Sequence, residues 1–139
     1  MIAIMRVSVR ADYALRAAIE LAAASDDRVP AEQLARAQHL PGEFLPTILT
    51  HLRRHNLVRL QRGPDGGFWL ARAASEIYLA EVVRAIDGGL PGVGSEPPET
   101  VACPGAAEPL ERVWAGLCAR GPAVLETVSL ADVVSGQVA

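Results

Sequence analysis

Apolar side chains recur with the period of an α-helix in four segments of this chain, which predicts a mainly helical fold. The predicted helices span residues 9–24, 31–38, 42–56 and 77–87. The side chains expected to be buried are Ala14, Leu15, Ala18, Ile19 and Ala22 in the first helix, Leu34 and Ala35 in the second, and Leu79, Val82, Val83 and Ile86 in the fourth. Gly88 follows the fourth helix, as is typical of a glycine C-cap.

Residues 42–70, GEFLPTILTHLRRHNLVRLQRGPDGGFWL, change from a helical to an extended pattern. The helix is expected to bury a face made of Phe44, Leu45, Ile48, Leu49 and Leu52. A short strand at 57–60, the turn-forming run 63–67 and a returning strand at 68–70 then predict a β-hairpin. Helices followed by such a hairpin are typical of a winged helix-turn-helix, so the expected fold class is mainly α with a small β-wing.

The outward face of the 42–56 helix and the hairpin carry residue types that contact DNA. The candidate DNA-binding residues are Glu43, Pro46, Thr47, Thr50, Arg53, Arg54, Arg62, Gly63 and Pro64. Residues 44–64 contain four arginines and no acid, and local positive charge supplies most of the non-specific affinity for DNA. Threonines can reach base edges, and an arginine at a hairpin tip suits a minor groove or a phosphate. The alternative is an ordinary amphipathic helix and hairpin with solvated charges.

The run 57–72, LVRLQRGPDGGFWLAR, preceded by FLPTILTHLRR and followed by EIYLAEVVRAIDG, resembles the IscR/NsrR/CymR (Rrf-type) family of winged-helix regulators. The runs MRVSVRADYALRAAIELA at 5–22 and PLERVWAGL at 109–117 fit the same pattern, so the resemblance covers nearly the whole chain. It implies a homodimeric transcriptional regulator on a palindromic operator, and many members sense iron–sulfur status, nitric oxide, redox state or a cysteine-metabolism signal. The family pattern begins at Met5, which is therefore the expected native start.

The expected division of the chain is a DNA-binding domain at 1–74 and a second part at 75–139, made of a linker helix, a flexible loop at 88–107 and a long last helix. The apolar stripe of the last helix is Leu110, Val113, Trp114, Leu117, Cys118, Gly121, Val124, Leu125 and Val128. Because this stripe approaches a heptad repeat, we expect a dimerisation helix, with packing inside its own chain as the alternative. Pro122 should kink it, and Ser129 begins a capping-box pattern for a terminal turn.

Charge is distributed unevenly along the chain, whose formal net charge is −3. Residues 1–72 hold ten arginines and seven acids (+3), whereas residues 73–139 hold three arginines and nine acids (−6). The basic half contains the candidate DNA-binding segment, which supports that prediction. No apolar run approaches the roughly 20 residues of a membrane span, and the N-terminus lacks a signal-peptide layout, so no membrane partner and a cytoplasmic location are expected.

Cys103 and Cys118 are too few for a disulfide framework. In cluster-binding members of the resembled family, three cysteines precede the long helix, whereas this chain has only Cys103 there and Glu108 at the last position. Thiolates are the usual cluster ligands, so the incomplete set argues against a standard iron–sulfur cluster. The open alternatives are a cluster shared across a dimer through Cys103, Glu108 or Asp12, a redox-reactive Cys103 thiol, and a non-metal effector or none.

The function expected from the sequence is a sequence-specific DNA-binding transcriptional regulator, a repressor or a dual regulator, that acts as a homodimer on double-stranded DNA. The alternative is a winged-helix protein-interaction module without DNA binding, with the acidic half as its partner surface. An enzyme is not expected, because the sequence lacks a nucleophile–base pairing, a phosphate loop and catalytic zinc spacing. His39, His51 and His55 have no accompanying cysteine or carboxylate and predict no metal site.

Overall fold

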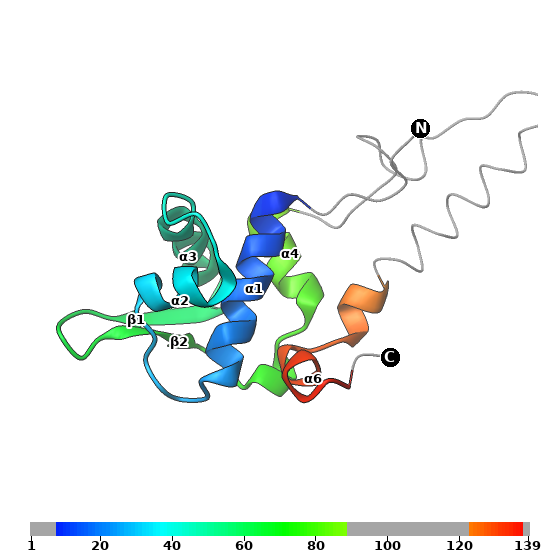
Figure 1. The fold of residues 1–139 in the computed structure, drawn as a ribbon. Helices are drawn as coiled ribbons and strands as arrows, with labels where there is room; N and C mark the ends of the chain where they lie inside the picture. Colours follow the sequence, from blue (N-terminus) through cyan, green and yellow to red (C-terminus); the bar gives the residue numbers. More distant parts are fainter. Residues whose placement is uncertain (1–7, 89–122, 138–139) are drawn as a thin grey trace, which may run out of the picture.

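The computed structural model describes residues 8–88 and 123–137. The elements in chain order are α1 (Val9–Ala23), α2 (Ala31–Gln38), α3 (Leu45–Arg54), β1 (Val58–Gln61), β2 (Gly67–Leu70), the 3-10 helix η1 (Ala74–Glu76), α4 (Leu79–Asp87) and α6 (Leu130–Ser135). Residues 123–127 are also helical. In Figure 1, α1 lies at the centre, with α2, α3 and the hairpin on one side and α4 and α6 on the other. Helices with a small antiparallel hairpin confirm the predicted fold class, whereas the loop 89–107 and most of the predicted long helix lie outside the described residues.

Helix α1 forms the centre of the core, because it packs against α2, α3, α4, α6 and β2. Its buried side chains are Ala11, Ala14, Ala17, Ala18 and Leu21. The predicted burial of Ala14 and Ala18 is confirmed, but Leu15, Ile19 and Ala22 are only partly buried. Alanines are small enough to let neighbouring helices approach α1 closely, so the alanine stripe faces the centre and the larger apolar residues lie at its margin.

Helix α3 buries Leu45, Ile48, Leu49 and Leu52, as predicted. It begins three residues later than expected, so Phe44 precedes the helix. The prediction that Phe44 is buried is wrong, because this residue is 43% exposed. The helix ends in a Schellman motif, in which Asn56 has a φ of +58° and its N–H donates to the carbonyl of Arg53 at 3.1 Å. The N–H of Leu57 donates to the carbonyl of Leu52 at 3.0 Å, which turns the chain directly into β1.

The hairpin pairs Val58 with Leu70, Arg59 with Trp69, Leu60 with Phe68 and Gln61 with Gly67. An isolated bridge joins Phe68 to Val29 in the α1–α2 loop through two backbone hydrogen bonds of 2.8 and 2.9 Å. A Cβ added at Gly67 would lie 2.7 Å from the Val29 nitrogen, so only glycine allows this close approach. The hairpin is therefore fixed to the loop before α2 as well as to α3.

The segment predicted as one helix at 77–87 is divided in the structure. Ile77 and Tyr78 are extended, and Tyr78 forms an isolated bridge with Ser129. Helix α4 then begins at Leu79 and ends at the expected glycine C-cap, Gly88, with a φ of +77°. Its buried residues are Ala80, Val82, Val83 and Ala85; Leu79 and Ile86, also predicted to be buried, are only partly so. Pairing with the returning chain explains the division, because it uses backbone groups that a longer helix would need.

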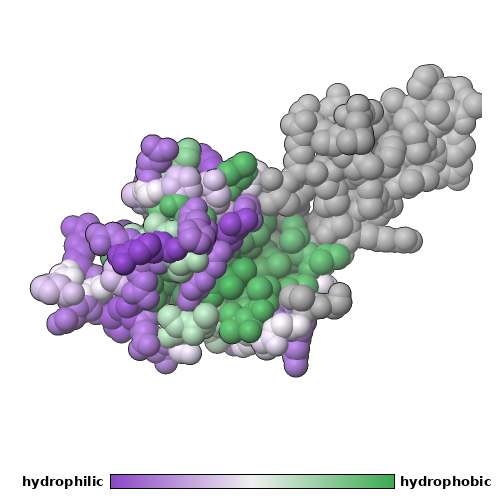
Figure 2. Space-filling model, in the orientation of Figure 1, coloured by the Kyte–Doolittle hydropathy of each residue, from purple (hydrophilic) through white to green (hydrophobic). Residues whose placement is uncertain are grey.

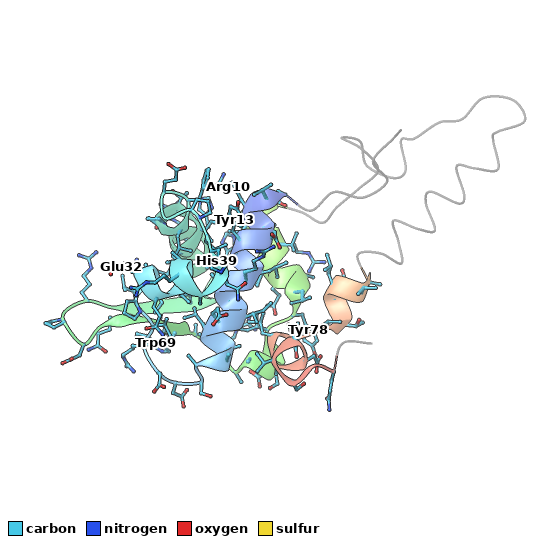
Figure 3. All side chains as sticks on the ribbon, in the orientation of Figure 1. Arg10, Tyr13, Glu32, His39, Trp69 and Tyr78 are labelled. Carbon is cyan, nitrogen blue, oxygen red and sulfur yellow. The ribbon has the colours of Figure 1, made fainter. Side chains whose placement is uncertain are left out.

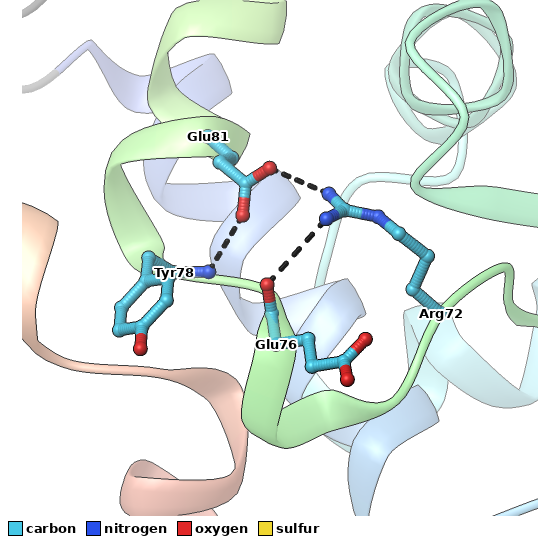
Figure 4. A network of polar contacts seen from close by, with 4 residues as sticks. All are labelled: Arg72, Glu76, Tyr78 and Glu81. Atoms are coloured by element: carbon cyan, nitrogen blue, oxygen red, sulfur yellow. Dashed lines mark hydrogen bonds and ion pairs between the residues drawn. The ribbon is translucent and has the colours of Figure 1, made fainter.

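A polar network fixes the start of α4 (Figure 4). The Glu81 carboxylate accepts from the Tyr78 N–H at 3.0 Å and from Arg72 at 2.5 Å, while Arg72 also donates to the Glu76 carbonyl at 3.5 Å. Burial alone would raise the pKa of Glu81, but these hydrogen bonds and the charge of Arg72 outweigh it and lower the pKa. Helix α6 has the predicted capping box, in which Ser129 and Asp132 exchange hydrogen bonds of 2.9 and 3.1 Å. Within the described residues, no helix is both long and apolar enough to cross a membrane.

Candidate nucleic-acid interface

The candidate residues of α3 share the side of the helix that faces away from the core. Pro46, Thr47, Arg53 and Arg54 are exposed, and Glu43 is exposed in the turn before the helix. Four buried leucine and isoleucine side chains on the opposite face hold α3 in place. Pro46 is the second residue of α3, where its missing N–H removes no helical hydrogen bond. The result is a helix anchored by its buried face, with a polar, outward surface.

Thr50 differs from Thr47 in the structure, although the sequence gives both the same expected role. Thr50 is half-buried, and its hydroxyl donates to the carbonyl of Pro46 at 2.8 Å. Its hydrogen is therefore already used within the helix, which leaves the oxygen lone pairs and the γ-methyl group for a ligand. The Thr47 hydroxyl forms no hydrogen bond within the described residues, whereas Thr50 and Thr127 each donate to a backbone carbonyl. Thr47 can therefore still donate and accept.

A groove of about 520 Å³ lies between the C-terminal half of α3 and the hairpin. Its lining residues come from α3, the following turn and both strands: Thr50, Arg53, Arg54, Asn56, Val58, Arg59, Leu60 and Trp69. Three arginines around one concave surface favour an anionic ligand, and the phosphates of a DNA backbone are such ligands.

The wing tip extends beyond the helices (Figure 1). Arg62, Gly63 and Pro64 are all exposed there, as the predicted site requires. Gly63 has a φ of +111°, and its carbonyl accepts from the Gly66 N–H at 3.0 Å, which closes the turn. Asp65 is also exposed at the tip and opposes the positive charge of Arg62.

The ion pairs of the described residues lie away from this surface, and Arg10, Arg28 and Arg36 also form none. Three arginines form ion pairs with acids in the part of the chain that the structure describes: Arg16 with Asp12, Arg72 with Glu81 and Arg84 with Glu126. None of these lies on α3 or the wing. Over residues 8–88 and 123–137, no ion pair involves Arg53, Arg54, Arg59 or Arg62. The surface of α3 and the wing therefore carries four arginines without an ion pair, with Asp65 and Glu43 as its exposed acids.

Two side chains that sequence reasoning missed also belong to this surface. Arg28, from the α1–α2 loop, places its guanidinium carbon 4.2 Å from the centre of the Trp69 ring on β2. Trp69 is labelled beside the hairpin in Figure 3. The Nε of Arg28 donates to the Gln61 side chain at 2.6 Å. Arg28 and Gln61 are 33 residues apart in the sequence. No local sequence pattern therefore predicts that the loop contacts the hairpin.

The expected sensor residues Cys103 and Glu108 lie outside the described residues, as do Cys118 and Pro122. Asp12, the other possible cluster ligand, forms its ion pair with Arg16 at 3.1 Å. No group of three or more histidine, cysteine, aspartate or glutamate side chains that could hold a metal ion is found among residues 8–88 and 123–137. Ser8 caps α1 by accepting from the Ala11 N–H at 2.9 Å, and its hydroxyl donates to Asp87 at 2.7 Å.

An exposed recognition helix followed by a basic β-wing is the arrangement of a winged helix-turn-helix protein. The Rrf2 family, described as "Iron-dependent Transcriptional regulator", matches residues 7–136 of the chain. The chain belongs to this family of transcriptional regulators, which confirms the resemblance found in the sequence.

Individual relatives agree with this assignment. An HTH-type transcriptional regulator of Mycobacterium tuberculosis is 45% identical over 133 residues, covering 95% of this chain and 83% of the relative. IscR of Photorhabdus laumondii is 31% identical over 135 residues, covering 96% of this chain and 81% of IscR. Among solved structures, CymR, the global cysteine regulator of B. subtilis, matches with a TM-score of 0.77 at 25% identity, over 94% of this chain and 96% of CymR. IscR of T. potens has the same fold, with a TM-score of 0.74 at 24% identity, over 95% of this chain and 88% of that IscR.

Proposed function

We propose that this protein is a homodimeric repressor that binds a palindromic operator through α3 and the wing. The observation that carries the proposal is the exposed face of α3 and the wing, whose arginines have no acidic partner among the described residues. DNA binding is also what membership of this regulator family implies.

Each part of this surface has a distinct proposed role. Helix α3 enters the major groove, where Glu43, Pro46 and Thr47 lie against base edges and the Thr50 methyl group contacts an apolar edge such as a thymine methyl. Arg53 and Arg54, which line the groove beside β1, bind phosphates. The wing residues Arg62, Gly63 and Pro64 contact the minor groove or its phosphates.

The proposed dimer gives the protein two copies of this surface. A two-fold symmetric pair reads two half-sites about one helical turn apart, which is why a palindrome is the expected operator. Apolar surface gathers over α1 in Figure 2. On this helix Leu15, Ile19 and Ala22 are only partly buried. Val124 and Val134 are 57% and 47% exposed. These residues support an apolar interface formed with the second part of the chain, residues 75–139, while residues 1–74 bind DNA.

A signal is proposed to act through Cys103. Cys103 and Cys118 are the only cysteines of the chain, fewer than the usual thiolate ligand set of an iron–sulfur cluster. A redox response of a single thiol needs no further ligand from the chain, and the alternative is a small non-metal effector. An absorption spectrum with iron and sulfide assays on protein purified without oxygen tests this part: stoichiometric iron would replace the thiol proposal by a cluster with non-cysteine ligands.

The function is tested by selecting duplexes from a random pool and measuring binding of the selected sequence by fluorescence anisotropy at several salt concentrations. The expected result is a palindromic operator whose log affinity falls linearly with log salt concentration, by about 0.9 for each phosphate contacted. Repression is measured as loss of transcript from a promoter that contains the operator. If no duplex shows salt-dependent binding, the protein is instead a winged-helix module that binds another protein.

A further inference from the structure

The α1–α2 loop contributes an arginine to the outer face of the wing. Val29 points into the core, is 4% exposed and bridges to Phe68 on β2. Because side chains alternate along an extended chain, Arg28 projects to the opposite, outer face. There it meets Trp69, which is paired across the hairpin with Arg59. The outer face of the wing therefore combines two arginines from different segments around one indole ring.

Two contacts fix the guanidinium of Arg28 in one position. The ring of Trp69 supports its face at 4.2 Å, and the Gln61 oxygen accepts from Nε at 2.6 Å. These contacts use the face and one N–H of the guanidinium, which has five N–H donors in a planar fork. Among the described residues, Nη1 and Nη2 of Arg28 form no hydrogen bond or ion pair. Four donors are thus held in place and directed at solvent.

The acidic side chains nearest to Arg28 in the chain are not its ion-pair partners. Asp26 and Asp27 precede Arg28 in the same exposed loop, yet neither forms an ion pair with it. Gln61, its hydrogen-bond partner, is the residue immediately before Arg62 at the wing tip. Trp69, its stacking partner, also lines the groove that contains Arg53 and Arg54. Arg28 therefore lies between two parts of the proposed DNA interface.

We propose that Arg28, held by Trp69 and Gln61, binds a phosphate of the operator backbone and so extends the DNA interface from the wing to the α1–α2 loop. This inference rests on the proposed function. The arrangement of Arg28, Trp69 and Gln61 is called the Arg28 clamp. An arginine fixed before binding loses little side-chain freedom when it binds a phosphate, so the clamp improves affinity without reading a base. The charge supplies the salt dependence, and the Trp69 stacking supplies the position.

The test compares the full chain with its Arg28→Ala, Arg28→Lys and Trp69→Leu variants in anisotropy titrations of the selected operator, from about 50 to about 200 mM salt. Arg16→Ala is the matched control, because Arg16 is also an exposed arginine but lies on α1 and is paired with Asp12. In Arg28→Ala the salt slope should become shallower by about 0.9 per protomer, or about 1.8 for a dimer. Arg28→Lys and Trp69→Leu should keep the wild-type slope and bind several-fold more weakly, because the charge remains and its fixed geometry is lost.

Two results would overturn the inference, and they are separable from failure of the proposed function. Arg28→Ala with the affinity and slope of Arg16→Ala would show that Arg28 does not contact DNA. A lower melting temperature in Arg28→Ala without a change of slope would show that the clamp only fastens the loop to the wing. Failure of the proposed function would instead appear in the wild-type protein, as binding to no duplex in a salt-dependent way.

Discussion

The side of the molecule formed by α3 and the wing differs from the side formed by α4, α6 and residues 123–127 in how its arginines are used. On the second side, Arg72 pairs with Glu81 at 2.5 Å, and Arg84 pairs with Glu126 at 2.6 Å. On the first side, the arginines of α3 and the hairpin have no acidic partner within the described residues. Paired charges join segments of the fold to each other, whereas unpaired charges attract a ligand of opposite sign.

Energetics explain how one small protein can support both arrangements. Exposed ion pairs contribute only about 0–1 kcal/mol each, so leaving several arginines unpaired costs the fold little. The stability of the α3 side comes instead from its buried face, which includes Leu45, Ile48, Leu49 and Leu52. The buried face of α3 and its proposed DNA-binding face are thus on opposite sides of the helix, so substitutions should affect stability and binding separately.

The largest effect is expected from the buried face of α3. Leu52 is fully buried, so Leu52→Ala should lower the free energy of unfolding by about 2–5 kcal/mol, through lost burial and the cavity left behind. Urea denaturation measures this change. Thr47→Ala, on the exposed face of the same helix, is the control and should change the free energy of unfolding by less than about 0.5 kcal/mol. Equal destabilisation by both would contradict the separation of the two faces.

The next largest effect is expected at the wing tip, and only on binding. Arg62→Ala should weaken operator binding by about 1–3 kcal/mol, since Arg62 has no acidic partner among the described residues and loses a groove or phosphate contact. Asp65→Asn is the opposite control, because removing the acid of the tip should strengthen binding. Anisotropy titrations with thermal melts measure both. Arg62→Ala with unchanged affinity would remove the wing from the interface.

A smaller difference is expected between the two threonines of α3. Thr47→Val should change affinity for the selected operator by about 1 kcal/mol and alter base preference, because it removes an available hydroxyl. Thr50→Val should change affinity by less than about 0.5 kcal/mol, since its hydroxyl hydrogen is already donated to Pro46 at 2.8 Å. Binding to a panel of single-base operator variants measures both effects. A larger effect from Thr50→Val would place its hydroxyl on a base.

The smallest effect is expected on the paired side, from Glu81. Its pKa lies below the ordinary value of 4.5, so its contribution to stability is present above that pH and is lost as the pH falls through the lowered pKa. Because Glu81 is about one-third exposed, the contribution should be below about 1 kcal/mol. Glu81→Gln should therefore lose less stability than the wild type on acidification, measured by urea denaturation. Glu76→Gln is the control, because Arg72 contacts only the backbone carbonyl of Glu76 (Figure 4). If Glu76→Gln reduced the loss of stability on acidification as much as Glu81→Gln, the effect would not come from Glu81.

The elements that could be predicted from the sequence are those whose signals are local. The buried face of α3, the span of α2, the hairpin turn, the glycine after α4 and the Ser129–Asp132 cap all follow from residues a few positions apart. The candidate residues on α3 and the wing could be chosen for the same reason, since a helix places every polar residue of its outer face by periodicity alone.

Other features depend on which segments meet in space, and local sequence patterns do not contain that information. The alanine stripe of α1 faces the core because several elements cross it closely, and the segment around Ile77 becomes extended because the returning chain pairs with it. The Arg28 clamp exists because Val29 bridges to Phe68 and brings a distant loop to Trp69. Sequence periodicity shows which face of an element is apolar, but it does not identify the element that packs against that face. Local sequence patterns thus predict α3, the wing and the family, whereas contacts between separate segments pair Arg72 and Arg84 with acids and place Arg28 beside Trp69.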